Sequence, residues 1–225
     1  MISYFKYGKG KLDICEDSLT ASVFDLLKYL PTDLFWYILK QALHQDYLPS
    51  YCGEILVIQY WAKWNAKETN NKNYVEPDIF MRFKDFDLII EAKRYDANQQ
   101  YIGQLENEIK SYLNEYSEDE KTLYLLQVGG LIDTCEAQYI KSGNIKVMQS
   151  KTNWTSLLKN IDSINKSYLE QNIPSQKPTQ LLFEDLVNVF AKHGFHQKMW
   201  LKDCHEIYNI NTQAINSFKI RKYGR

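Results

Sequence analysis

The sequence predicts an α/β protein in which a mixed β-sheet is covered by helices on both faces. Apolar residues recur at helical spacing in several segments, and short runs rich in β-branched and aromatic residues lie between them. Residues 122–128, TLYLLQV, are apolar on both faces, as expected for a central strand buried on both sides. This order of helices and strands predicts one sheet between two helical layers.

The N-terminal part is predicted to form two helices and then three strands. The first helix, capped by Asp17 or Ser18, has apolar residues at helical spacing: Leu19, Val23, Leu26 and Leu30. A second helix follows Pro31, and a strand is expected over residues 53–64. After a polar loop over 65–73, residues 76–95 are expected to form a β-hairpin.

The C-terminal part is predicted to continue with alternating helices and strands. A helix over 98–116 leads to the central strand, which ends at Gly129-Gly130. A short helix before Gly143, a strand over 144–149 and a helix over 152–164, capped by Thr152 or Asn153, are expected next. Two prolines predict a linker at 171–180, after which residues 181–225 form a small helical C-terminal appendage with a helix over 181–194.

Composition excludes several classes of protein. The chain has 225 residues, of which 44% are hydrophobic and 24% charged, so it can bury a large core. Its four cysteines form no CxxC pair, and no apolar run is long enough to span a membrane. The N-terminus does not resemble a signal peptide. These features predict a cytoplasmic protein without a membrane partner. The net charge of -1 argues against a general polycation, although residues 191–225 carry seven Lys or Arg against two acids. That basic segment is either a solvated tail or an arm that binds phosphates.

The hairpin at 76–95 brings charged residues together. A turn at Lys84-Asp85 pairs residues whose numbers sum to 169, which leaves one face wholly apolar. The other face pairs Arg82 with Asp87 and Asp78 with Glu91, and Lys93 lies on the same side. Opposed residues have Cβ atoms roughly 4.5–5.5 Å apart, so Asp78 and Glu91 would repel each other unless a cation lay between them. A Mg²⁺ ion is the expected partner, since it favours carboxylates together with water and phosphate oxygens. The structural alternative is a salt-bridged hairpin in which Lys93 neutralises the two acids.

Pro77-Asp78 followed by Glu91-Ala92-Lys93 resembles the motif of the PD-(D/E)XK nuclease superfamily, which has the restriction-endonuclease-like fold. The resemblance covers about residues 16–165 and implies an αβββαβ core within a domain spanning 1–170. It also implies a glutamine that faces the site from the following helix, matched by Gln104 with Gln100 as a second candidate. A further acid of the family is matched by Glu16, with Glu54 as its rival.

The resemblance implies a Mg²⁺- or Mn²⁺-dependent nuclease, most simply a DNA endonuclease of bacterial defence or mobile-element processing. Asp78, Glu91 and Glu16 would bind the metal, Lys93 would assist the attacking water, and Gln104 would position water or phosphate. The expected partner is nucleic acid, with a protein partner or a second copy of the chain as further possibilities. The alternative function is a catalytically inactive nuclease-like module that binds DNA or a protein.

Other candidate sites are weaker. His193, His196, Cys204 and His205 suggest zinc, but their spacing matches no standard zinc module. Tyr60, Trp61 and Trp64 could stack on bases, yet such aromatic residues more often fill a core. P-loop, dinucleotide and GxSxG motifs are absent from the sequence.

Overall fold

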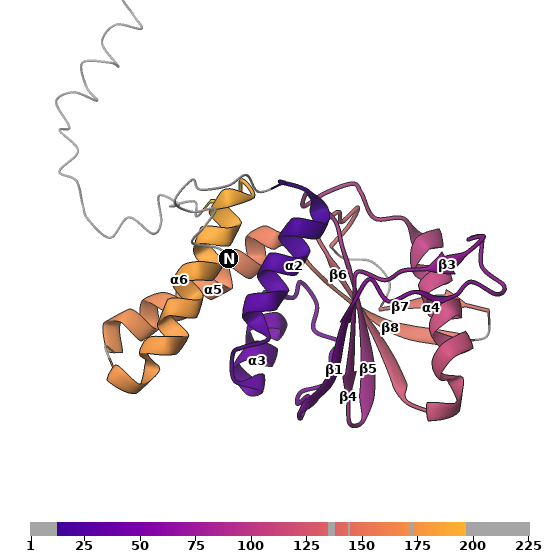
Figure 1. Ribbon diagram of the computed structural model, residues 1–225, viewed down its shortest axis with the longest axis horizontal. Helices are drawn as coiled ribbons and strands as arrows, with labels where there is room; N and C mark the ends of the chain where they lie inside the picture. The colour runs from indigo at the N-terminus through magenta and orange to yellow at the C-terminus, as the bar shows by residue number, and fades with distance from the viewer. Residues whose placement is uncertain (1–12, 135–137, 144, 172, 197–225) are drawn as a thin grey trace, which may run out of the picture.

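The computed structural model describes residues 13–134, 138–143, 145–171 and 173–196, which build a six-stranded mixed sheet flanked by helices (Figure 1). The sheet order is β1-β4-β5-β6-β8-β7. Three antiparallel strands form one half: β1 (Ile55–Tyr60), β4 (Ile79–Phe83) and β5 (Phe86–Ala92). The other half has two strands parallel to β5 and an antiparallel edge strand: β6 (Thr122–Val128), β8 (Ile145–Thr152) and β7 (Tyr139–Ser142). The predicted mixed α/β sheet is therefore confirmed.

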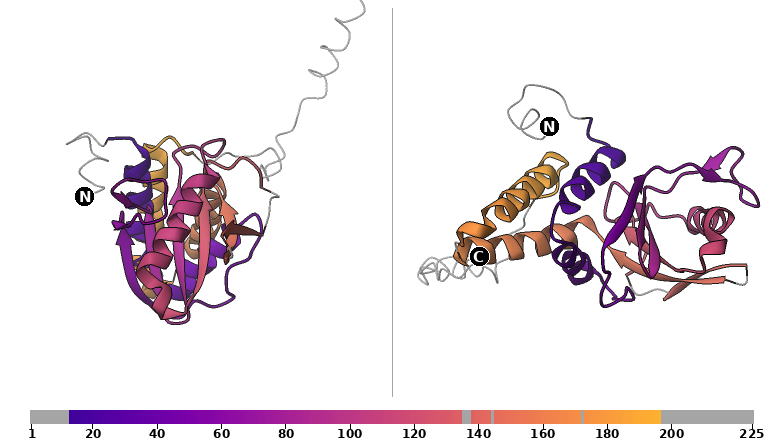
Figure 2. Two further views of the ribbon diagram at one scale, coloured as in Figure 1. Left: turned by 90° about the vertical axis from the view of Figure 1, so that its right-hand side faces the viewer. Right: turned by 60° about the horizontal axis from the view of Figure 1, so that its bottom comes forward.

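Helices cover the two faces of the sheet unequally (Figures 1 and 2). One face carries four helices: α2 (Glu16–Leu27), α3 (Thr32–Ala42), α5 (Trp154–Gln171) and α6 (Lys177–Lys192). The other face carries α4 (Ile102–Tyr116). Short 3₁₀ turns lie at Ser117–Asp119 and Pro174–Gln176. Among the described residues, no helix combines the length and apolar character needed to cross a membrane.

Each face of the sheet has its own hydrophobic core. Leu126 and Val128 of β6 pack into the core beneath α2, α3, α5 and α6, whereas Leu123 and Leu125 pack into the core beneath α4. Successive side chains of a strand point to opposite faces, so this alternation means that β6 is buried on both sides. The predicted central strand is therefore confirmed.

The β4–β5 hairpin has the predicted register. Ile79 pairs with Ile90, Met81 with Leu88, and Arg82 with Asp87. The apolar face of the hairpin lies in the four-helix core, and Phe80 and Ile89 on the other face lie in the α4 core. A shift of one residue would exchange the two faces, so burial on both sides enforces this register.

The strand predicted over 53–64 is interrupted. β1 ends at Tyr60, and Trp61 has φ of 49°, a left-handed conformation that breaks the strand. β2 (Trp64–Asn65) instead pairs with β3 (Tyr74–Val75) in a separate two-stranded sheet. The loop predicted over 65–73 is thus the tip of a hairpin, which we call the β2–β3 arm (residues 64–75).

Two local predictions are wrong. The cap of α2 is Cys15, whose Sγ accepts from the Ser18 amide at 3.4 Å while the Cys15 amide donates to Ser18 Oγ at 3.1 Å. Tyr139–Ser142 form strand β7, because they pair along β8 and bury Ile140 and Ser142. The short helix expected before Gly143 is therefore not present at these residues. The Asn153 cap of α5 is confirmed by its hydrogen bond from the Ser156 amide at 2.7 Å.

The linker predicted over 171–180 is too long. α5 continues to Gln171 and α6 begins at Lys177, with Pro178 in its first turn, where the missing N–H of proline costs no helical hydrogen bond. The predicted helix over 181–194 is the main part of α6. Phe183, Leu186 and Phe190 join the same core as α2 rather than forming a separate one.

Candidate functional site

Asp78, Glu91 and Lys93 meet at one end of the β4–β5 hairpin. Asp78 directly precedes β4, and its Oδ2 accepts from the backbone amide of Ala92 at 2.8 Å. Lys93 Nζ donates to Glu91 Oε1. The Glu91 side chain is 1% exposed, and Asp78 is also buried. The predicted convergence of the two acids and the lysine is present in the structure.

The further acid of this cluster is Glu16, the first residue of α2. Its Oε1 lies 3.5 Å from Lys93 Nζ, and its Oε2 accepts from the Arg94 amide at 2.9 Å. Glu54 precedes β1, whose first residue, Ile55, pairs with Phe83 beside the hairpin turn. Glu54 is therefore at the opposite end of the strand from Asp78. The length of β1 separates it from the cluster that Glu16 joins.

The two candidate glutamines have different roles. Gln104 Nε2 donates to Glu91 Oε1 at 2.5 Å, so this side chain contacts the carboxylate itself. Gln100 Nε2 donates to the backbone oxygens of Glu91 and Gly129 at 3.3 and 3.2 Å, and its Oε1 accepts from Gln127 at 3.1 Å. Gln100 thus ties the ends of β5 and β6 together beneath the site.

Gly130 allows the end of β6 to lie against Lys93. This glycine has φ of 64°, and a Cβ atom there would lie 2.6 Å from Lys93 Cβ. Any side chain would push the lysine away, in addition to the strain of a left-handed backbone. The Lys93 backbone is held from the other side by Trp154, whose Nε1 donates to the Lys93 carbonyl at 2.6 Å.

Glu108 is a further acid of the site that the sequence analysis missed. It lies one turn beyond Gln104 on α4 and is 1% exposed. Apart from the contact between the Glu91 and Glu108 carboxyl groups, neither Glu108 oxygen has a hydrogen-bond partner in the described part of the chain, and the same holds for Glu91 Oε2. The spacing of Gln104 and Glu108, four residues apart on one helix face, is the signal that could have identified it.

Charge is unbalanced in this cluster. Four carboxyl groups, those of Glu16, Asp78, Glu91 and Glu108, gather around the single ammonium of Lys93. Burial raises the pKa of Asp78 to about 8, and the nearby Glu91 adds to the rise. Burial also raises the pKa of Glu91. Burial and then the charge of Glu91 raise the pKa of Glu108 well above its usual range.

Lys93 is charged in this setting. Burial alone would lower its pKa, but Glu91 and then Glu16 outweigh that effect and raise it. One lysine cannot neutralise four acids. The alternative of a salt-bridged hairpin, in which Lys93 neutralises the acids, therefore accounts for only part of the cluster. Buried carboxylates with too little positive charge beside them bind protons or cations.

The residues present fit a divalent cation in their chemistry. Among the described residues, three buried carboxyl oxygens of Glu91 and Glu108 have no partner apart from each other, and hard cations such as Mg²⁺ prefer oxygen ligands. Within the described ranges, no group of three or more His, Cys, Asp or Glu is already arranged around a common point as a metal site. Lys93 and Gln104 both donate to Glu91 Oε1, so a cation at Glu91 would compete with these hydrogen bonds.

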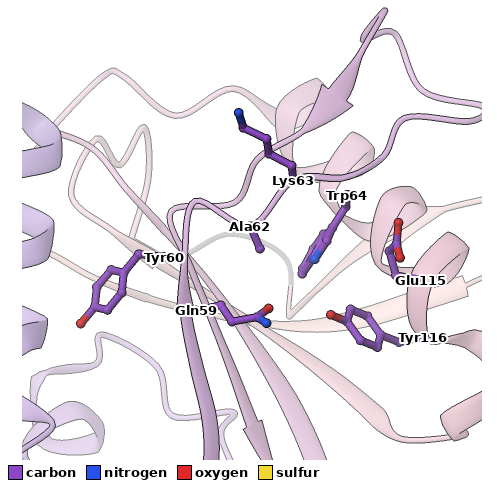
Figure 3. A pocket seen from close by; sticks show the side chains of 7 residues that line it. All are labelled: Gln59, Tyr60, Ala62, Lys63, Trp64, Glu115 and Tyr116. Carbon is purple, nitrogen blue, oxygen red and sulfur yellow. The ribbon is translucent and has the colours of Figure 1, made fainter.

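The other predicted sites do not join this cluster. An open hollow of about 460 Å³ beside β1 is lined by Gln59, Trp64 and Tyr116, whose side chains converge in Figure 3, while Tyr60 points to the opposite face of the sheet. Trp64 is buried in the α4 core, as the interpretation of these aromatic residues as core predicted.

The two ring nitrogens of His193 contact Ser18 Oγ and the Val189 carbonyl, each at 2.9 Å. Cys204 and His205 lie outside the described residues.

Comparison with known proteins identifies one informative relative. The chain is 32% identical over 205 residues to the "Uncharacterized protein PM0110" of Pasteurella multocida (strain Pm70), and the alignment covers 86% of this chain and 75% of that protein. No family model matches the chain, and no solved structure matches it. At this identity and coverage, the chain belongs to the same family as PM0110.

Proposed function

We propose that the protein is a metal-dependent nuclease that hydrolyses phosphodiester bonds, with DNA as its substrate. The observation that carries the proposal is the excess of buried carboxylates over cations around Lys93. Burying an uncompensated carboxylate is costly, and a divalent cation would remove that cost. The same cation would bring phosphate oxygens to the cluster.

The order of elements supports the finer assignment to the restriction-endonuclease-like fold. Helix α2 is followed, after α3, by three antiparallel strands, β1, β4 and β5, with the β2–β3 arm inserted between the first two. Helix α4 and the parallel strand β6 come next. Asp78 immediately precedes the second of these strands, and Glu91 and Lys93 lie in and after the third. This is the αβββαβ order that the PD-(D/E)XK resemblance implies.

The chemistry divides among the residues of the cluster. Asp78 and Glu91 would hold the cation, with Glu16 completing the acidic shell and Glu108 as a further acid beside Glu91. Bound there, the cation would lower the pKa of a water molecule and neutralise phosphate charge. The Lys93 ammonium is placed to orient that water or to stabilise negative charge on the phosphate. Gln104 fixes the Glu91 carboxylate and offers an amide donor to a water or phosphate oxygen.

The test is cleavage of plasmid, linear duplex and single-stranded DNA by the purified full chain in Mg²⁺ or Mn²⁺. We expect cutting by the wild type, and at least a hundredfold slower cutting by Asp78→Asn, Glu91→Gln and Lys93→Ala. Asp85→Asn is the matched control, because Asp85 is an exposed acid in the turn of the same hairpin. RNA of the same sequence should be tested in parallel to establish which nucleic acid is cut.

Two results would contradict the proposal. Cutting that survives all three substitutions would come from a contaminant or from another site. Failure of the folded wild type to cut any substrate while still binding DNA would favour the catalytically inactive module instead.

A further inference from the structure

A cavity opens between the β2–β3 arm and helix α4, directly beside the acidic cluster. Its volume is about 450 Å³, within the range of roughly 300–1,000 Å³ typical of small-ligand sites. Gln104 and Glu108 form part of its wall, so the cavity borders the acidic cluster. Asn70, Asn71, Tyr101 and Asn107 form much of the remaining wall.

The arm that forms one wall is fastened to α4 along its length. Asn65 is the main attachment point, since its amide donates to Glu115 Oε1 at 2.8 Å and its carbonyl accepts from Ser111 at 2.5 Å and from Asn114 at 3.0 Å. Asn114 also donates to the Lys67 carbonyl at 2.8 Å. Because these four hydrogen bonds hold residues 65–67 of the arm against α4, the cavity is a preformed feature rather than a gap beside a loose loop.

Asn107 joins helix α4 to the arm at the cavity wall. Its Oδ1 accepts from the Asn70 amide of the arm at 3.3 Å. Together with Asn71 and Gln104, it lines the cavity with side-chain amides, which carry both donors and acceptors and match the edges of nucleobases.

Tyr101 provides an aromatic surface at the mouth of the cavity. The residue is 69% exposed, and its ring lies over Gly103. A Cβ atom on Gly103 would lie 2.7 Å from Tyr101 Cε1, so the glycine leaves room for the ring in this position. An exposed tyrosine at the mouth of a cavity is a suitable platform for stacking a base.

We propose that this cavity binds one unpaired nucleobase of the strand whose phosphate lies at the acidic cluster. The base would stack on Tyr101 while its edge contacts Asn107 and its neighbouring amides. This inference rests on the proposed nuclease function, since it concerns a nucleotide next to the scissile phosphate. Exposed lysines on the arm, Lys67 and Lys72, are placed to contact the backbone of the same strand.

A paired base cannot enter such a cavity without leaving the helix. Extruding a base from a duplex costs unstacking and unpairing energy, which a single strand does not incur. The protein should therefore bind single-stranded DNA more tightly than duplex DNA of the same sequence.

The test measures binding apart from cleavage. Full-length protein carrying Asp78→Asn is titrated in Mg²⁺ with single-stranded and duplex oligonucleotides that contain 2-aminopurine, whose fluorescence falls on stacking. We expect at least tenfold tighter binding of the single strand. Adding Tyr101→Ala should weaken single-strand binding about tenfold and leave duplex binding unchanged, whereas Tyr101→Phe should retain both the affinity and the quenching. Tyr29→Ala is the matched control, because Tyr29 is also 69% exposed but belongs to the four-helix side of the sheet.

Equal affinity for the two forms, or an equal loss on both from Tyr101→Ala, would overturn the base-binding proposal. Cleavage by the wild type combined with that result would leave the nuclease proposal intact. Conversely, a Tyr101-dependent preference for single strands in a wild type that cuts nothing would support the cavity and reject the nuclease.

Discussion

The β4–β5 hairpin buries an acid near each end, and the two acids have opposite surroundings. Asp87 is 0% exposed and fully partnered: Arg82 Nε and NH2 lie 3.2 Å from its oxygens, Tyr112 donates at 3.0 Å, and Lys121 is 3.7 Å away. Glu91 shares Lys93 with other acids and has an oxygen without a partner in the described structure. The same helix serves both ends, because α4 supplies Tyr112 to one acid and Gln104 and Glu108 to the other.

The difference separates an acid whose charge the protein itself compensates from one whose charge it does not. A buried carboxylate surrounded by the protein's own cations and donors contributes to a defined fold. A buried carboxylate placed beside further acids costs stability unless something from outside neutralises it. Uncompensated buried charge of this kind is characteristic of sites where a ligand provides the missing charge.

The largest effect is expected at the partnered end. Asp87→Asn removes the charge that balances Arg82, and we expect a loss of about 3 kcal/mol in the free energy of unfolding. Urea unfolding followed by circular dichroism would measure it, with the exposed Asp85→Asn expected to stay within about 0.5 kcal/mol of wild type. An Asp87→Asn protein as stable as the wild type would remove the distinction between the two ends.

A slightly smaller effect of opposite sign is expected from metal at the unpartnered end. Saturating Mg²⁺ should raise the free energy of unfolding by about 2.7 kcal/mol at a hundredfold excess over its Kd. Glu91→Gln should abolish the increase, and EDTA should reverse it. Titration calorimetry with Mg²⁺ on the same two proteins provides the binding constants. An equal increase in Glu91→Gln would place the bound ion elsewhere.

An intermediate effect is expected from pH in the metal-free protein. The folded state raises the pKa of Asp78 to about 8, so between pH 4 and 8 it retains a proton that the unfolded chain has lost. Stability should therefore fall as pH rises through this window, and the fall should shrink in Asp78→Asn. Because metal binds the deprotonated carboxylate, Mg²⁺ affinity should rise over the same range. Thermal unfolding at several pH values, with and without Mg²⁺, would reveal both trends.

The smallest effect is expected from Glu108→Gln. The amide cannot ionise, so it removes the cost of keeping an acid buried beside Glu91, and the metal-free protein should gain about 1 kcal/mol of stability. Stabilisation by Mg²⁺ should become weaker in the same variant. A loss of stability in EDTA would instead mean that Glu108 is held by a favourable interaction, as Asp87 is.

Sequence reasoning succeeded where neighbouring residues carry the information. The hairpin register followed from twenty consecutive residues, because alternating side chains allow only one pairing with an apolar face. That register in turn predicted that Asp78, Glu91 and Lys93 lie together. The broken strand at Trp61 and strand β7 were missed because short segments depend on partners elsewhere in the fold. The Cys15 cap was missed because cysteine is not among the residues that usually cap a helix.

The amino-acid pattern alone predicted the sheet, the central strand and the convergence of Asp78, Glu91 and Lys93, since strand alternation is a local property. The choice of Glu16 over Glu54, the arrival of Glu108 beside Glu91 and the arm that closes the cavity required the packed molecule. Each depends on where a helix or hairpin docks against the sheet, and that position is set by burial of residues far apart in the chain. A single carboxylate on a helix looks like a solvated surface group until packing removes its water.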